Sequence, residues 1–315
     1  MYIHHGICDA GTLFKLYGHL TKIINDLISD KYVDDKQYGV MGSEKGTENV
    51  KNNLIGKVDE NEELKRNFEA RCKGSLLMEA FKPPYERNLS TGFVLKHLNV
   101  VETNDFIQNC KEAGITVNTA LIAIINTAIV ELIKHKIVEK EYFDISYNVA
   151  VDNRRYWQED TSDKLGCIIG SLIHGMKTPV NVREIFWDYA KDLHRSISKA
   201  FNEAEHLQQE ILRERQQAKD FSYENYISGI PPVLTDFFFT NPGDVTKVIG
   251  SKGSQVEMTA MIPYISMQKG NYTNGHLFHT YHGSLQYLLV FSEYYIDTYL
   301  AHKLADTVID LLKTV

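Results

Sequence analysis

The sequence predicts an α/β fold in which helices flank a mixed sheet, and three segments carry this prediction. Residues 12–28 place Leu, Ile and Tyr at helical spacing, which predicts an amphipathic helix capped by Asp9 or Thr12. Residues 143–152 alternate apolar with mainly polar side chains, which is the period of a strand. Residues 117–133 form an apolar run that is too short to cross a membrane and contains Asn and Glu, so it predicts a buried helix.

The other elements are expected in chain order. Residues 31–75 are polar, with few apolar side chains that could anchor a core, and predict a long surface crossover. Residues 182–219 predict one long helix with an apolar face in its first half and a charged, Gln-rich second half, whose far end projects into solvent. We further expect strands over residues 91–101, 236–240, 258–267 and 284–291, and helices over residues 103–113 and 296–312.

Composition argues against several classes of function. The chain has 315 residues, of which 43% are hydrophobic, enough for a sizeable core. Its 34 Lys and Arg against 41 Asp and Glu give a net charge of -7, without a basic cluster that could follow a nucleic acid backbone. The four cysteines are far apart, so no zinc knuckle or redox pair is predicted. We expect a cytoplasmic protein, because neither a signal peptide nor a transmembrane segment is recognisable.

The motif that carries chemistry lies at the start of the chain. The run His4-His5-Gly6-Ile7-Cys8-Asp9-Ala10-Gly11 places two imidazoles and a carboxylate on a predicted tight turn before the first helix. A histidine can take a proton from a hydroxyl or an amine during attack, which accelerates such reactions by about two to four powers of ten. His5 is therefore the candidate base, with His4 and Asp9 beside it.

This spacing resembles the HHxxxDG signature of the chloramphenicol acetyltransferase-like superfamily, which includes peptide-synthetase condensation domains and alcohol acetyltransferases. The resemblance implies that His5 is the catalytic base and that Asp9 is chiefly structural, paired with an arginine from the other half of the fold. Ala10 stands where the superfamily usually has glycine, and a positive φ there would strain an alanine. The implied architecture is mainly the C-terminal half of that fold, with the loop and helix of the histidine motif.

Two further segments resemble the same superfamily. Val151-Asp152-Asn153-Arg154 is similar to its VDxR element, which makes Arg154 the implied partner of Asp9 and leaves Arg155 as the second candidate. We expect Asp152 to fix the strand end before Arg154. Thr240-Asn241-Pro242-Gly243 is similar to the SNxG element near the acyl site, where Asn241 and Gly243 would support a developing oxyanion.

The resemblance implies an acyltransferase of the alcohol acetyltransferase-like branch. It would move an acyl group from an acyl-CoA cosubstrate to a small molecule that bears a hydroxyl, with no metal and no permanently bound cofactor. Two alternatives remain open. One is an amide-forming condensation-type enzyme, and the other is a catalytically silent remnant that acts as a binding subunit.

The resemblance also divides the chain in two. Residues 1–75 are interpreted as a remnant of the N-terminal half with the histidine motif, a helix and the polar crossover, and residues 76–315 as the C-terminal acyltransferase-like domain. In relatives that carry both halves on one chain, a full segment of strands and helices precedes the motif. We therefore expect either a missing N-terminal half or a partner chain that supplies it.

Other residues allow competing interpretations. Cys8 could be a nucleophile activated by histidine, but a small buried filler is favoured. His276, His279 and His282 could form a metal site, although strand geometry would turn His279 away from the other two, which favours ordinary histidines. The charged residues 203–219 could dock a partner, but a solvated surface is the more common role of such a run.

Overall fold

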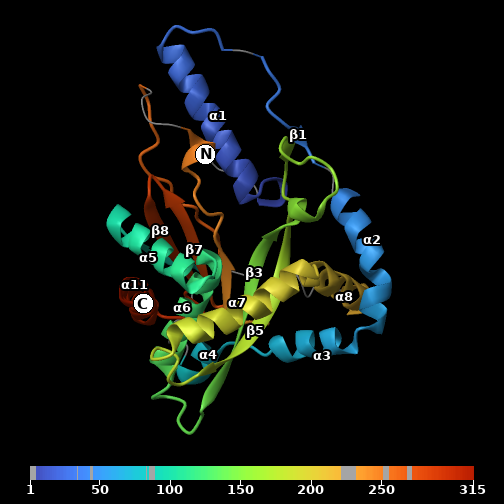
Figure 1. The fold of residues 1–315 in the computed structure, drawn as a ribbon, viewed down its shortest axis with the longest axis vertical. Helices are drawn as coiled ribbons and strands as arrows, with labels where there is room; N and C mark the ends of the chain where they lie inside the picture. Colours follow the sequence, from blue (N-terminus) through green and yellow to red (C-terminus); the bar gives the residue numbers. More distant parts are fainter. Residues whose placement is uncertain are drawn as a thin grey trace.

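The structure is a computed structural model that describes residues 5–33, 35–42, 45–82, 84, 89–220, 232–250, 255–267 and 272–315. Its centre is a six-stranded mixed sheet in the order β2-β8-β7-β6-β3-β5 (Figure 1). β6 is parallel to both of its neighbours, and the other pairs are antiparallel. The strands are β2 (Thr91–His97), β3 (Tyr142–Asp152), β5 (Ile169–Pro179), β6 (Phe237–Thr240), β7 (Asn274–Tyr281) and β8 (Ser284–Ser292). The predicted α/β fold is confirmed.

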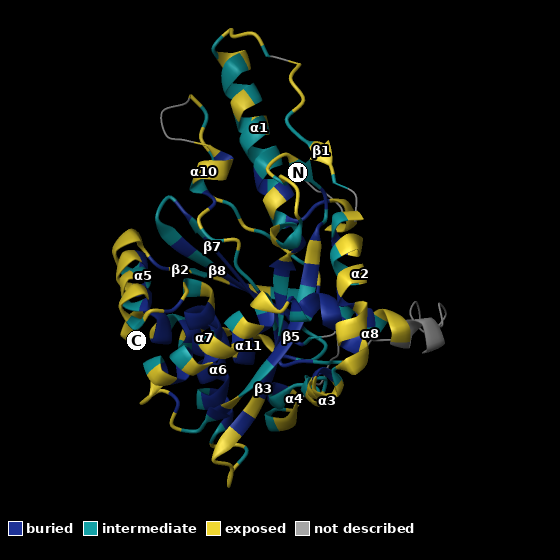
Figure 2. Ribbon diagram, turned by 45° about the vertical axis from the view of Figure 1, so that its right-hand side comes forward, coloured by how far each residue is buried: buried dark blue, intermediate teal, exposed yellow. Residues whose placement is uncertain are grey.

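Four helices cover one face of this sheet: α5 (Val100–Ala113), α6 (Val117–Ile133), α7 (Phe186–Asn202) and α11 (Thr298–Thr314). Alternate residues of β3, among them Phe143, Ile145 and Tyr147, point into the same apolar core as these helices. Figure 2 shows α6 and the strands beside it as largely buried. The predicted buried helix and the predicted strand at residues 143–152 are thus both present.

α6 begins where Thr116 caps the backbone N–H of Thr119, and almost all of its residues are buried. Over the described residues, no helix taken singly has both the length and the apolar character to cross a membrane. The bent pair of α5 and α6 meets those two criteria only when both helices are counted together.

The first helix, α1 (Ala10–Ile28), matches the prediction from spacing. Asp9 caps it, since Oδ1 accepts a hydrogen bond of 2.8 Å from the backbone N–H of Thr12. Figure 1 shows α1 extending away from the sheet, and it packs against the short helix α10 (Thr246–Ile249). Ala10 is the first helical residue and is not among the described residues with positive φ. Alanine at this position is therefore free of the strain considered above.

The prediction of a polar crossover over residues 31–75 is wrong for most of its length. Two helices form there, α2 (Lys45–Glu60) and α3 (Glu62–Arg71). Each buries two apolar side chains four residues apart, Leu54 and Val58 in α2 and Leu64 and Phe68 in α3. Two apolar residues are enough to anchor each helix in this polar segment, because residues four apart lie on the same helix face. A two-residue strand, β1 (Val40–Met41), also pairs here with β4 (Lys164–Leu165).

The single long helix predicted over residues 182–219 is instead two helices. α7 ends at Asn202, and α8 (Glu205–Asp220) begins after Ala204, whose φ of 50° breaks the helix. The first half of α8 packs against the rest of the protein, whereas Glu214 and Arg215, nearer the far end, are exposed. Leu207 and Ile211 are buried against α2, which lies beside α8.

Polar side chains of α8 cover the edge of the sheet at β5. Gln209 pairs with the backbone of Ile173 in both directions, as Oε1 accepts from its N–H and Nε2 donates to its carbonyl oxygen, each at 2.8 Å. Arg213 donates to the carbonyl oxygen of Ser171 at 3.2 Å. The side-chain amide thus takes the place of a neighbouring strand at Ile173 and satisfies this part of the edge.

One strand prediction in the last third is wrong, and one strand in the middle of the chain was not predicted. Residues 258–267 form no strand, and their course is fixed by side chains, with the Thr91 hydroxyl accepting from the backbone N–H of Met267. β5 was not anticipated at all. β7, which carries His276 and His279, is a full strand of eight residues.

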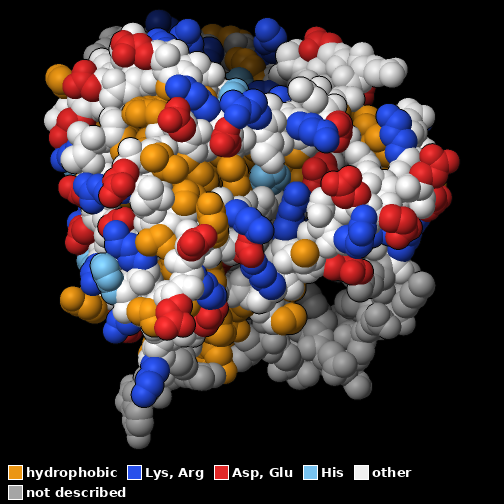
Figure 3. Space-filling view, turned by 60° about the horizontal axis from the view of Figure 1, so that its bottom comes forward, with side chains coloured by type: hydrophobic (Ala, Val, Ile, Leu, Met, Phe, Trp, Pro, Cys, Tyr) orange, Lys and Arg blue, Asp and Glu red, His pale blue; other side chains and the backbone are white. Residues whose placement is uncertain are grey.

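The surface in Figure 3 carries Lys and Arg interspersed with Asp and Glu, with hydrophobic side chains between them. On that face, the mixture agrees with the absence of a long basic cluster from the sequence.

Asp236, just before β6, connects three elements from a fully buried position. Its carboxylate accepts from the backbone N–H of Leu76, which begins α4 (Leu76–Ala80), and from that of Ser146 in β3 at 2.9 Å. Burial raises the pKa of Asp236 to about 7, although both hydrogen bonds oppose the shift. The folded protein therefore retains this proton at pH values where the unfolded chain releases it.

We expect wild-type stability to fall relative to Asp236→Asn as pH rises from roughly 4 to 7, by up to about 1.4 kcal/mol per pH unit. Urea unfolding at a series of pH values measures this difference. Asp144→Asn is the control, since Asp144 is an exposed carboxylate on β3. A difference between wild type and Asp236→Asn that stays constant over this range would contradict the expectation.

Candidate active site

His5 lies in a short 3-10 turn, η1 (His5–Ile7), that leads into the cap of α1. Its Nδ1 is 2.9 Å from the carbonyl oxygen of Cys8. A carbonyl can only accept, so Nδ1 carries a proton, and the tautomer that fits this contact has its lone pair at Nε2. The residue before it, His4, lies outside the described residues.

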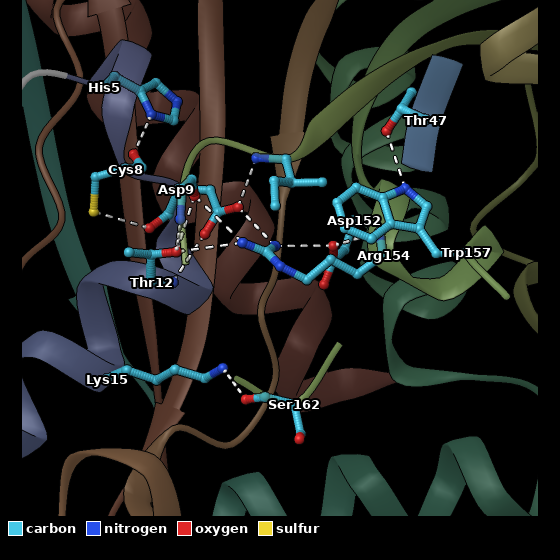
Figure 4. Close-up of polar contacts among 12 residues, drawn as sticks. His5, Cys8, Asp9, Thr12, Lys15, Thr47, Asp152, Arg154, Trp157 and Ser162 are labelled. Atoms are coloured by element: carbon cyan, nitrogen blue, oxygen red, sulfur yellow. Dashed lines mark hydrogen bonds and ion pairs between the residues drawn. The ribbon is translucent and has the colours of Figure 1, made fainter. Parts of the chain in front are cut away.

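Asp9 is buried and uses both carboxylate oxygens (Figure 4). Oδ1 caps α1 through Thr12, whereas Oδ2 accepts from Arg154 Nη1 at 2.7 Å and from the backbone N–H of Ile168 at 2.9 Å. Burial by itself would raise the pKa of Asp9, but these hydrogen bonds and the Arg154 charge outweigh it and lower the pKa. Asp9 is therefore a fixed anion that holds the turn.

Arg154 comes from η2 (Asn153–Tyr156), the turn that follows β3. Besides Asp9, it donates to Asp152 Oδ1 at 3.0 Å and to the carbonyl oxygen of Gly166 at 3.3 Å. The ion pair that the resemblance implied between positions 9 and 154 is present. It joins the first turn of the chain to the end of a central strand.

The loop between β4 and β5 completes this cluster, and the sequence analysis did not find it. The backbone of Gly166 exchanges two hydrogen bonds of 2.9 Å with the hydroxyl of Thr12, and its carbonyl oxygen also accepts from the backbone N–H of Asp9. These contacts use backbone atoms of the loop. The one sequence signal was the glycine itself, whose φ of 133° disfavours other residues.

His5 lines a cavity of about 500 Å³, here called the histidine cavity. Asn148, Phe238 and Tyr272 are among its other walls. A second cavity of about 600 Å³, the helix-side cavity, is lined by Asp9 and Arg154 together with residues of α6 and α7.

The two cavities lie on opposite faces of the sheet. Asn148 of β3 lines the histidine cavity, whereas Val149 and Val151, which point toward the helices, line the helix-side cavity. Ala150 and Ile169 border both. The turn from His5 to Asp9 therefore passes from one cavity to the other at the end of β3.

Asn241 and Gly243 lie at the helix-side cavity or beside it, not with His5. Asn241 Nδ2 donates to Asn118 at the start of α6 at 2.6 Å, and Oδ1 accepts from the backbone N–H of Gly243 at 3.0 Å. Gly243 has a φ of 83°, which suits glycine. Asn118 is thus a further member of the site that the sequence analysis did not assign.

Cys8 is buried, and its thiol donates to the carbonyl oxygen of Asp9 at 3.4 Å. Burial raises the pKa of this thiol, and the Asp9 charge raises it further. Both effects disfavour the thiolate that a nucleophile needs.

The three C-terminal histidines lie in different surroundings. His276 is buried on the helix side, where its Nδ1 meets the Tyr287 hydroxyl at 2.9 Å, while His279 is buried on the other face. Burial lowers the pKa of His276 to about 3 and that of His279 to about 4. His282 lies in the turn between β7 and β8. No group of His, Cys, Asp or Glu that could hold a metal ion occurs within the described ranges.

Comparison with known proteins identifies the fold. No family model and no curated protein matches the chain in sequence. Three solved structures resemble it over 97% to 99% of its length at 13% to 14% identity. They are trichothecene 15-O-acetyltransferase from Fusarium sporotrichioides (TM-score 0.68), the condensation domain from Monacolin K polyketide synthase MokA (0.67) and the epimerization domain from the third module of tyrocidine synthetase B (0.63).

The chain spans 64% to 67% of the length of these structures. It therefore has the α/β fold of about two thirds of a chloramphenicol acetyltransferase-like or condensation domain. At this level of identity the likeness concerns the fold.

Replacing Asp9 by asparagine is expected to destabilise the protein by about 3 kcal/mol, because it leaves the buried guanidinium of Arg154 without its anion. The contribution of Asp9 is present above roughly pH 4, the ordinary range of a carboxyl, and is lost as pH falls further, since folding lowers this pKa. Chemical denaturation from pH 7 down to pH 3 measures both effects.

Asp152→Asn is the matched control. Asp152 also binds Arg154, but its side chain is 58% exposed, so the expected loss is below about 1 kcal/mol. Equal losses for the two variants would contradict the assignment of Asp9 as the anchor.

Proposed function

We propose that the chain transfers an acyl group from a coenzyme A thioester to an alcohol, with His5 as the general base. The observation that carries the proposal is the hydrogen bond from His5 Nδ1 to the Cys8 carbonyl oxygen, at the border of a cavity. It leaves the lone pair of Nε2 available to a hydroxyl proton. A cytoplasmic setting, where acyl-CoA is available, is part of the proposal.

In the proposed reaction, the acceptor oxygen attacks the thioester carbonyl carbon while its proton passes to His5 Nε2. The tetrahedral intermediate then collapses, the carbon–sulfur bond breaks, and the imidazolium returns the proton to the leaving thiolate. The products are an ester and free coenzyme A, so protons and electrons balance without a metal or a redox cofactor.

In this scheme, Asp9 and Arg154 hold His5 in place and take no part in proton transfer. Their buried ion pair fixes the α1 cap, and the cap fixes the carbonyl of Cys8 that orients His5. They are positioning residues, because neither contacts the ring of His5.

Two substrates need two approaches to one base. The histidine cavity and the helix-side cavity open on opposite faces of the sheet and share Ala150 and Ile169 as walls. Asn241 lines the helix-side cavity, so it would support the oxyanion only if the thioester oxygen enters from that side.

His5→Ala should lower the rate of thiol release from acetyl-CoA, measured with a panel of alcohols, by about two to four powers of ten. His302→Ala, at an exposed histidine on α11, is the control and should retain the wild-type rate. If wild type releases no more thiol than His5→Ala, the enzyme proposal fails and a non-catalytic binding role takes its place.

The likeness to condensation domains supports a second candidate, amide formation from a carrier-bound acyl group. The chemistry at His5 would be the same, with an amine in place of the alcohol. Offering amines and acyl-carrier thioesters in the same assay separates the two candidates.

A further inference from the structure

Arg155 follows the arginine that holds Asp9, yet it has a different environment. Its guanidinium carbon lies 5.5 Å from the ring centre of Phe201 and 5.6 Å from that of Tyr156. The Tyr156 hydroxyl donates to the carbonyl oxygen of Phe201 at 2.9 Å, so the two rings form a fixed platform. Contacts of this kind hold a guanidinium in place and leave its N–H groups available for an anion.

No carboxylate lies within ion-pair distance of Arg155 among the residues that the structure describes. Arg155 nevertheless borders the helix-side cavity. The acidic side chains that line this cavity form hydrogen bonds or ion pairs with groups other than Arg155. Asp9 and Asp152 bind Arg154, and Asp244 accepts from the backbone N–H and the hydroxyl of Thr246 at 2.9 and 2.6 Å.

The other polar groups of the cavity favour a small, polar ligand. Ser198 and Asn202 of α7 line the wall next to Phe201, and His194 lies on the same helix with its Nδ1 at 3.1 Å from the Thr119 hydroxyl. Lys15 adds a second positive charge, whose ammonium group donates to the carbonyl oxygen of Ser162 at 2.7 Å. An anion in this cavity would meet positive charge not already paired with a carboxylate.

We propose that the helix-side cavity binds the acceptor by a carboxylate group, held by the guanidinium of Arg155, so that the acceptor is a hydroxy acid. This inference rests on the proposed acyl transfer. A planar guanidinium pairs with a carboxylate through two parallel hydrogen bonds. With its acidic end at Arg155, the acceptor would have to place its hydroxyl at Ala150 and Ile169, the walls that the two cavities share.

The test uses ω-hydroxyhexanoate and its neutral amide, which differ only in the charge of one end. Isothermal titration should give at least tenfold weaker binding of the acid to Arg155→Met than to wild type. Methionine keeps the packing against the two rings and removes the charge. Arg155→Lys, which keeps the charge, should lose less affinity, and the amide should bind wild type and Arg155→Met within twofold of each other.

Arg66→Met is the matched control, because Arg66 is an exposed arginine on α3 and its loss changes the net charge equally. Binding of the acid to Arg66→Met should equal that to wild type. The proposal is overturned if wild type does not bind the acid, if Arg155→Met binds it as tightly as wild type, or if acid and amide lose affinity in parallel.

Coenzyme A is the other source of an anion. If Arg155→Met loses affinity for coenzyme A and not for the acid, the guanidinium holds the donor phosphates and the acceptor proposal is wrong. His5→Ala should bind the acid with wild-type affinity. If wild type binds the acid but releases no more thiol than His5→Ala, the acyl transfer is disproved while the carboxylate site remains, so the two failures are distinguishable.

Discussion

The ion pair between Asp9 and Arg154 is the constraint on which the site depends. A buried pair of this kind contributes little net stability compared with apolar packing, because both charges lose their water. Its effect is geometric. Asp9 accepts hydrogen bonds from Thr12, Ile168 and Arg154, so it fixes the turn of His5 relative to a helix, a loop and the end of β3 at once. A neutral side chain could not accept all three.

Because alternate side chains of β3 point to opposite faces of the sheet, the site has a cavity on each face. Side chains of Asn148 and Val149 point to opposite faces of the sheet, and each borders a different cavity. The turn between His5 and Asp9 crosses the end of the strand where those cavities are separated only by small or apolar side chains such as Ala150. A base at one end and a fixed anion at the other then follow from a connection of only five residues, rather than from a long, separately folded loop.

Periodicity and motif spacing made much of this fold and site predictable from the sequence. α6 and β3 have strong apolar patterns, and Arg154 was found through its VDxR resemblance. α2 was missed, because Leu54 and Val58 are its only buried apolar side chains in a polar segment. Contacts made by backbone atoms were also missed. Gly166 binds Thr12 and Asp9 through its N–H and carbonyl groups, which leave no side-chain pattern to detect.

The two neighbouring arginines have different roles: Arg154 holds the structure of the site, whereas Arg155 is the residue proposed to bind a substrate. The described hydrogen-bond partners of the Asp9 carboxylate are Thr12, Arg154 and Ile168, and Gln209 pairs with the backbone of the edge strand β5 at Ile173. The hydrogen bonds that hold the turn of His5 are therefore made by groups within the described part of the chain. Arg155 differs, because aromatic rings hold it and no acid within the described residues forms an ion pair with it. Arg154 and Arg155 are consecutive in sequence, yet the first is committed to the anchor and the second remains available to a ligand.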